Sequence, residues 1–445
     1  MKIKILVAAL LLIIQGFNIS PIYGQNNNWT VQKCIDYALQ KNIQVQQTIL
    51  TNNANKVNFD ALKASRFPIV DATANQDFGW SEKVNTFTNK YTGLSGTNNT
   101  NYSVGSSVTI YQGLKLKQSV KQSDLNYKAG QFDSETMKES ISLNIMDAFL
   151  QILFAEEQVK NAQNQIDLTN KELTLASERL SLGVIANSDY LLVKSQLATE
   201  KQTLAAAKGL LATDRVTLMQ FMELPITNDF QINQPDLTSV INKYRNTLPD
   251  SVYQIALAIK PQIKSAALNS ESAALGVDIA KTDYMPKVGL NAGVSSDYLS
   301  SLQGSSYPFQ LTHNFNPSFG ISLSIPIYHN DQIKSKIELA KINTQNANLN
   351  EQNTKNLLRK AIETACTNVI TAQNEYDASR EQYLAAQESY SVASEKYTQE
   401  ILNSVDFLVQ KTNFNTAESS FLQAKYNLIF SYKTLDFYLG IPFNF

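Results

Sequence analysis

Histidine and cysteine are scarce in this sequence, which has two of each among 445 residues. Both histidines, His313 and His329, stand beside predicted strands, and we expect them in exposed loops rather than in a metal site. The sequence also lacks an HExxH zinc motif, a P-loop glycine pattern and a GxSxG nucleophile motif. No cofactor and no enzymatic activity are therefore expected.

The two cysteines, Cys34 and Cys366, stand in predicted helices of opposite halves of the chain. An exported protein can join two such residues in a disulfide, but we favour two small buried apolar residues. Neither cysteine stands near the end of the N-terminal leader, so no lipid attachment site is expected.

An excess of charge and long apolar runs are also missing. The 38 Lys and Arg residues against 39 Asp and Glu residues give a formal net charge of −1, and the basic residues form no cluster. Nucleic-acid binding is therefore not expected. No stretch approaches the roughly 18 apolar residues that a transmembrane helix needs.

The N-terminus has the pattern of a signal peptide. Lys2 and Lys4 precede an apolar run at residues 5–14, and polar residues follow as far as Gln25. Because the run is too short to span a bilayer, we expect a cleavable signal peptide at residues 1–24. The mature protein is then exported without a helical anchor.

The strongest positive signal is an unbroken seven-residue repeat. Its bulky row consists of Ile145, Ile152, Val159, Ile166, Leu173 and Leu180. Its small row consists of Ala148, Ala155, Ala162, Thr169 and Ala176. This pattern predicts a coiled coil, and a helix over residues 114–182 would be about 100 Å long. A turn at residues 183–188 and a second apolar seam from Tyr190 to Leu218 predict an antiparallel hairpin over residues 114–222.

The hairpin occurs twice. Residues 178–225 align without a gap on residues 395–442 at a constant offset of 217, which places Asp189 on Asp406 and Lys194 on Lys411. The sequence therefore predicts a structural duplication. We expect a first repeat at residues 25–225, a linker at 226–249 that lies as a strap against the helices, and a second repeat at 250–445. The second hairpin is expected at residues 330–439.

Each repeat also changes from a helical to a two-residue period. Apolar residues alternate with small or polar ones at about residues 69–80, 102–111, 287–295 and 318–328, and each pair of segments is joined by a loop rich in Asn, Ser, Thr and Gly. One such strand alone fits an ordinary half-buried hairpin. Four of them in an exported chain favour membrane β-strands, with one face toward lipid and one toward a water-filled lumen.

Four strands are too few to close a membrane barrel, and open edges are not tolerated in lipid. The barrel must therefore be shared between chains, and three chains supply twelve strands. Long helices from the same chains would cover one another's apolar seams. We expect a mainly α-helical chain with four membrane β-strands in a homotrimer.

The order helix, helix, strand, strand, long helix, turn, long helix, present twice, resembles the TolC-like outer membrane efflux proteins. Local motifs agree at residues 38–44 and 256–262 and at the tip turns 183–189 and 400–406. The resemblance implies a homotrimer with a 12-stranded barrel in outer membrane lipid and a 12-helix α-barrel in the periplasm. It also implies docking to a periplasmic adaptor protein and an inner-membrane transporter.

The tip turns are the candidate working site. After the turn that includes Gly183, we expect Asn187 and Ser404 to act as helix N-caps, with Asp189 and Asp406 two residues later. A carboxylate there can simply complement the helix dipole, for about 0.3 to 1 kcal/mol. In a trimer the same carboxylates would ring the mouth of the duct and attract cations.

The resemblance adds a latch that keeps the mouth closed. The family's tip aspartate matches Asp189 and its latch tyrosine matches Tyr397, whereas Leu402 stands where the family has an arginine. Val409 replaces a second aspartate that narrows the pore. The resemblance thus implies that changing Asp189 and Tyr397 together would loosen the closed mouth.

Aromatic residues allow two interpretations. Tyr376, Tyr383, Tyr390 and Tyr397 are expected to pack between helices rather than to line a substrate path, and Trp80 with Tyr102 fits an interfacial aromatic girdle or ordinary strand packing. The preferred function is a passive outer membrane channel for efflux or secretion, gated at its helical tips. The alternatives are an exported coiled-coil protein of structural or adhesive function, and an adaptor of the same machinery.

Overall fold

The computed structural model describes residues 28–82, 84–91, 93–227, 229–241, 248–301 and 304–443. The chain forms two compact units. The first unit comprises Met1–Ile43, Ser140–Leu248 and Thr364–Phe445, and the second comprises Gln44–Glu139 and Pro249–Glu363. Both units therefore combine segments from the two halves of the sequence. The signal peptide expected at residues 1–24 lies outside the described residues.

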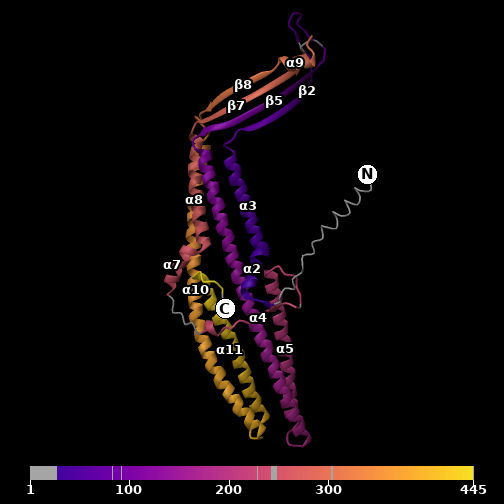
Figure 1. The fold of residues 1–445 in the computed structure, drawn as a ribbon, viewed down its shortest axis with the longest axis vertical. Coiled ribbons are helices and arrows are strands. Elements are labelled where there is room, and N and C mark those ends of the chain that lie inside the picture. Colours follow the sequence, from indigo (N-terminus) through magenta and orange to yellow (C-terminus); the bar gives the residue numbers. More distant parts are fainter. Residues whose placement is uncertain are drawn as a thin grey trace, which may run out of the picture. The chain divides into compact units, whose positions relative to one another are not determined.

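The second unit contains a four-stranded antiparallel sheet in the order β2-β5-β7-β8 (Figure 1). The strands are β2 (Ile69–Ser81), β5 (Ser95–Gln112), β7 (Lys287–Leu299) and β8 (Asn316–Ser324). All four expected strands are present, and β5 and β7 are longer than expected. The expectation that the last strand reaches residue 328 is wrong. Because Pro326 has no N–H to donate to the ladder, the strand ends before it.

The sheet has one apolar face and one polar face. Leu290 of β7 pairs with Ile321 of β8 and with Val108 of β5 on the apolar face. On the other face Gly293 pairs with Ser318 and with Gly105. Phe319 and Ile321 are 72% and 69% exposed in the single chain. An apolar face left open, opposite a face of small polar residues, is the pattern of a membrane strand.

The long polar loops of the sheet contain regular structure that the sequence pattern did not predict. The first holds a small hairpin of β3 (Val84–Asn85) and β4 (Lys90–Tyr91), and the second holds the helix α9 (Tyr307–His313). His313 is exposed, as expected, but it is the last residue of α9 rather than part of a loop. Its ring hydrogen-bonds the Phe309 carbonyl. His329 lies exposed in a loop, as expected.

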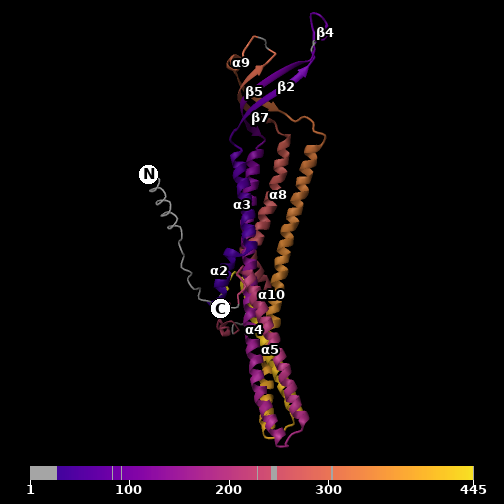
Figure 2. The ribbon, with the colours of Figure 1, turned by 90° about the vertical axis from the view of Figure 1, so that its right-hand side faces the viewer.

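Helices adjoin the sheet in the same unit (Figure 2). They are α3 (Ile43–Ala64), α7 (Pro249–Ile259), α8 (Pro261–Lys281) with the short η1 (Thr282–Tyr284), and the first parts of α4 (Lys115–Ser181) and α10 (Gln332–Thr398). None of the described helices has the length and apolarity needed to cross a membrane.

The first unit contains the lower parts of two hairpins, α4 with α5 (Asn187–Phe221) and α10 with α11 (Ser404–Tyr438) (Figure 1). The α4 and α10 helices both have 67 residues, and α5 and α11 both have 35. Helices α4 and α5 begin and end 217 residues before α10 and α11, for example at Lys115 and Gln332. The duplication predicted from the sequence is therefore confirmed.

Short elements complete the first unit. They are β1 (Asn28–Trp29), α2 (Val31–Lys41), β6 (Gln231–Ile232) and α6 (Thr238–Ile241). Thr30 caps α2 by accepting a hydrogen bond from the Lys33 N–H. The linker between the repeats is held by β6, which pairs in parallel with β1.

Cys34 on α2 and Cys366 on α10 are both buried, and no disulfide joins them. Burial raises the pKa of the Cys34 thiol to about 12, which keeps it protonated and unreactive. The preference for two buried apolar residues over a disulfide is confirmed.

The tyrosine row of α10 packs between the phenylalanines of α11. Tyr397 stacks on Phe407 with ring centroids 4.5 Å apart, and Tyr390 lies 5.9 Å from Phe407 and 5.2 Å from Phe414. The same alternation continues upward through Tyr383, Phe421 and Tyr376. The row is therefore interhelical packing, as expected.

The environment of two carboxyl groups in the first hairpin, Asp147 on α4 and Asp214 on α5, disfavours their ionised form. Burial raises the pKa of both, and the charge of Asp147 raises that of Asp214 further. A carboxyl group with a raised pKa stabilises the fold most at acid pH, and this stability is lost as pH rises through the raised pKa.

We expect Asp214→Asn to raise the melting temperature of the helices at pH 7.5 but not at pH 4. Circular dichroism at both pH values measures this, and equal gains would contradict it.

Candidate functional site at the helical tips

Each hairpin ends in the same turn, built on one residue with a left-handed backbone. In the first turn this residue is Gly183, with φ +74°, and in the second it is Glu400, with φ +61°. In both, an N–H bonds back five residues, from Val184 to the Arg179 carbonyl and from Ile401 to the Lys396 carbonyl. These are Schellman turns, in which glycine is the usual left-handed residue. Glu400 therefore adopts its conformation at a cost of about 1 to 2 kcal/mol.

The N-caps lie one residue earlier than the sequence predicted. Asn403, not Ser404, caps α11, since its Oδ1 accepts the Asp406 N–H at 2.8 Å and its Nδ2 donates to the Asp406 carboxylate at 2.8 Å. Ala186, not Asn187, occupies the cap position of α5 and offers no side-chain hydrogen bond. Asn187 and Ser404 are thus the first helical residues.

The shifted caps place Asp189 and Asp406 at the third helical position of their helices. Asp406 and Asn403 form a reciprocal cap, so capping of the helix start is enough to account for an aspartate at this position. The Asp189 carboxylate makes no hydrogen bond or ion pair within the described residues. Its role at a mouth shared by several chains stays a proposal.

Arg179 near the end of α4 ties the first hairpin to the second. Its guanidinium donates to the backbone carbonyls of Tyr397 at 3.2 Å and Thr398 at 2.9 Å, and its carbon lies 5.4 Å from the centre of the Tyr397 ring. A weaker ion pair joins it to the exposed Glu400 carboxylate at 3.7 Å. Arg179 is only 8% exposed. The tip thus has a buried arginine link, donated by the first hairpin.

Two of the residues that the resemblance singled out in the second hairpin, Tyr397 and Leu402, lie in an apolar cluster of the tip. Tyr397 is 6% exposed and packs with Ala393, Phe407 and Leu408, and Leu402 lies against this cluster. The Tyr397 hydroxyl makes no hydrogen bond within the described residues. Tyr397 therefore contributes its ring and its carbonyl to the tip, and Leu402 contributes apolar contact.

The left-handed glutamate gives a test of the backbone strain in its turn. Glu400→Gly should relieve the backbone strain, for about 1 kcal/mol, and remove an exposed ion pair that contributes less than that. We expect an equal or slightly higher melting temperature by circular dichroism, although the ion pair between Arg179 and position 400 is lost. Gly183→Ala is the matched control. An added Cβ at Gly183 meets nothing within 4 Å, so only the backbone cost of about 1 kcal/mol remains, and stability should fall.

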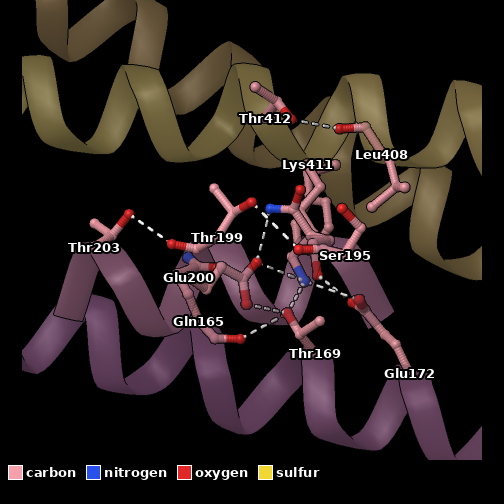
Figure 3. A network of polar contacts seen from close by, with 12 residues as sticks. Gln165, Thr169, Glu172, Ser195, Thr199, Glu200, Thr203, Leu408, Lys411 and Thr412 are labelled. Carbon is pink, nitrogen blue, oxygen red and sulfur yellow. Dashed lines mark hydrogen bonds and ion pairs between the residues drawn. The ribbon is translucent and has the colours of Figure 1, made fainter. Parts of the chain in front are cut away.

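Above the tip, a fully buried lysine joins the two hairpins again (Figure 3). Lys411 of α11 donates to Glu172 of α4 at 2.8 Å and to the Thr169 hydroxyl, and it lies 3.4 Å from a Glu200 carboxylate oxygen of α5. The Tyr390 hydroxyl donates weakly to Glu172 at 3.5 Å. Lys411 is 0% exposed, so its charge is compensated by these two carboxylates rather than by water.

A cavity of about 360 Å³ lies beside this cluster, between α4, α5 and α11. Its lining includes Gln165, Glu200, Asn415 and Glu418, together with small residues such as Ala162 and larger apolar ones such as Leu210. Burial raises the pKa of the Glu418 carboxyl, to which Gln165 donates at 3.5 Å. The region between the hairpins is therefore polar and incompletely packed.

Sequence reasoning missed Arg179 and Lys411. Both stand on heptad helices where a charge usually faces water, and their partners lie more than 200 residues away in sequence. A comparison of the two repeats could have drawn attention to Lys411. Lys194 aligns on Lys411, but Ser389 and Ala417 stand where the first repeat has Glu172 and Glu200.

Solved structures share this fold. The outer membrane channel CmeC of Campylobacter jejuni matches with a TM-score of 0.79 and 18% identity, over 93% of this chain and 86% of that chain. VceC of Vibrio cholerae matches with 0.77 and 16%, over 93% and 97%. The open state of the MtrE channel of Neisseria gonorrhoeae matches with 0.74 and 18%, over 92% and 89%. A comparison with curated protein sequences finds no match.

A family model describes both repeats. The model of the outer membrane efflux protein family matches residues 34–222 and again residues 252–441, which include both hairpins and all four strands of the sheet. The fold class and the resemblance inferred from the sequence are thereby confirmed. The chain belongs to the outer membrane efflux protein family.

Proposed function

We propose that three copies of the chain form a passive channel through the outer membrane, which conducts exported substrate and is gated at the helical tips. The observation that carries this proposal is the four-stranded sheet with one exposed apolar face and two outer edges, those of β2 and β8, that pair with no other described strand. In lipid such edges must be paired. Three sheets joined edge to edge would form a closed barrel of twelve strands.

The hairpins complete the duct on the periplasmic side. Their seams bury apolar residues within one chain, yet exposed large apolar side chains remain on the helices, such as Leu191, Leu210, Leu384 and Val409. A ring of six hairpins from three chains would cover such surfaces. The substrate then passes through the lumen without chemical change, since the family is one of efflux proteins.

The gate is assigned to the tips because the two hairpins of a chain are joined there by the buried Arg179. Arg179 holds the Tyr397 and Thr398 carbonyls, and Asp189 and Asp406 stand at the helix starts around the mouth. The partners proposed for opening are a periplasmic adaptor protein and an inner-membrane transporter, which would supply the substrate.

Mass and conductance together test the proposal. Protein extracted from the outer membrane fraction is sized by light scattering with the detergent mass subtracted, and then inserted into planar bilayers. Three chains per particle and discrete conductance steps are expected. A single chain that conducts no ions would overturn the channel and favour an exported coiled-coil protein with a structural or adhesive role.

A further inference from the structure

The cavity between α4, α5 and α11 has more hydrogen-bond acceptors than donors. Gln165 lines it and is only 8% exposed, and its Oε1 is buried without a donor within the described residues. Asn415 on α11 lines the same cavity, and its Oδ1 is buried and unpaired in the same way. Buried acceptors in folded proteins are nearly always hydrogen-bonded. Two unpaired ones in the lining of one cavity therefore indicate a ligand with N–H or O–H donors.

The charges around the cavity favour a cation as that ligand. Lys411 is shared by two carboxylates, Glu172 at 2.8 Å and Glu200 at 3.4 Å (Figure 3). Glu418 lines the cavity as a third carboxylate and forms no ion pair in the part of the chain that the structure describes. Its side chain accepts only the 3.5 Å hydrogen bond from Gln165 there. With three acids and one lysine ionised, a cation next to Glu418 would compensate negative charge that no described side chain compensates.

The size and the apolar part of the lining favour an organic cation. The volume of about 360 Å³ lies in the range of small-molecule sites, and Leu210 and Leu422 contribute apolar surface. The hydrocarbon body of an amine gains free energy on leaving water for such a surface, whereas a hydrated inorganic ion does not. A primary ammonium group also has three N–H donors, enough for the Glu418 carboxylate, the Gln165 Oε1 and the Asn415 Oδ1. We propose that this cavity is a binding site for a small organic ammonium ion.

The duplication shows that a hairpin of this length does not need these acceptors for its own packing. At the offset of 217 residues, Asn415 of α11 aligns on Ala198 of α5, and Glu418 aligns on Lys201. Both helices nevertheless have 35 residues and the same place in their hairpins. An apolar and a basic residue are thus compatible with the helix at these two positions, and the acceptors are particular to this cavity.

The site lies within one compact unit of a single chain, since all the lining residues belong to the first unit. It therefore does not rest on the proposed trimer. Binding is expected whether the extracted protein is a trimer or a monomer, so a protein that binds the ligand but conducts no ions would refute the proposed function and leave this inference intact.

Fluorine NMR on the full-length protein in detergent tests the proposal. The probe is para-fluorobenzylammonium, and the neutral para-fluorobenzyl alcohol has nearly the same shape. We expect the wild type to shift and broaden the fluorine signal of the ammonium ion saturably, and to bind the alcohol about tenfold more weakly or worse, because hydrogen bonds to a charged group are stronger. Absence of saturable ammonium binding, or equal binding of the alcohol, would overturn the proposal.

A matched pair of variants locates the site. Glu418→Gln keeps the shape of the side chain and removes its charge, so the ammonium ion should bind about tenfold more weakly or worse. Asp167→Asn also removes one negative charge, from an exposed residue of α4 outside the lining, and binding should be unchanged. Both variants are measured in the same detergent, so uptake of the probe into micelles cancels. Equal losses in the two variants would mean general attraction by charge and would overturn the site.

A third variant separates binding from stability. Asn415→Leu removes an unpaired buried acceptor, so we expect a higher melting temperature without ligand and weaker binding of the ammonium ion. Unchanged binding would overturn the contact with Asn415. Displacement of the probe by an equal concentration of Mg²⁺ would assign the site to an inorganic cation and overturn the organic ligand.

Discussion

Replacing Arg179 with alanine is expected to give the largest change in gating of any single substitution at the tips. The change removes two hydrogen bonds from a buried guanidinium to the carbonyls of Tyr397 and Thr398. A hydrogen bond to a charged group contributes about 1.5 to 3 kcal/mol. The two bonds together contribute about 3 to 6 kcal/mol. Since 1.4 kcal/mol is about a tenfold change in an equilibrium, the closed tip should be disfavoured by roughly a hundred- to ten-thousandfold per chain.

Single-channel conductance and entry of a large antibiotic into cells measure this effect. Arg179→Ala should raise both, because the hairpins of each chain then separate at the mouth. Tyr397→Phe is the matched control, since it keeps the ring and the carbonyl and removes a hydroxyl without a described partner. We expect it to behave as the wild type. An effect of Tyr397→Phe equal to that of Arg179→Ala would assign the latch to the tyrosine hydroxyl instead.

The arginine that joins the two hairpins does not stand where the resemblance implied it. The resemblance implied an arginine in the second hairpin at the position of Leu402. The structure has the arginine in the first hairpin, at Arg179, where it reaches the end of α10. A charge donated from either hairpin can join the two. Alignment to the family pattern therefore did not locate the arginine that joins the hairpins of this chain.

Regular features of the fold were predictable because they are local. The heptads and the tip turns placed the long helices within one or two residues of α4, α5, α10 and α11. The strands followed from alternation of side chains. The helix-cap prediction was wrong because two neighbouring residues are both of a type that caps helices. Asn403 and Ser404 are both good caps, and only the geometry shows that Asn403 accepts the Asp406 N–H.

Contacts between distant helices were not predictable in this way. A lysine at position 411 of a heptad helix fits an exposed face as well as a buried one, and only the approach of α4 and α5 surrounds it with Glu172 and Glu200. The left-handed backbone of Glu400 was hidden for a similar reason. Its counterpart Gly183 suits the turn, whereas a glutamate does not mark a left-handed residue in a sequence.

The second large effect is expected in the sheet. Phe319→Arg places a charge on the exposed apolar face of β8, opposite Ala292 of β7. If this face contacts lipid, the arginine costs up to about 2 to 4 kcal/mol at the bilayer midplane and less toward its surfaces. The cost recurs in every chain of a trimer, so we expect the variant to be nearly absent from the outer membrane fraction.

Ser318→Arg supplies the matched control, because the neighbouring residue of the same strand points to the opposite face. Its side chain would enter a water-filled lumen, where a charge is solvated, so assembly should be close to that of the wild type and only conductance should change. Quantitative blotting of outer membrane fractions measures both variants. Equal loss of the two would mean that both faces are packed against protein, and the sheet would then belong to a soluble head rather than to a membrane barrel.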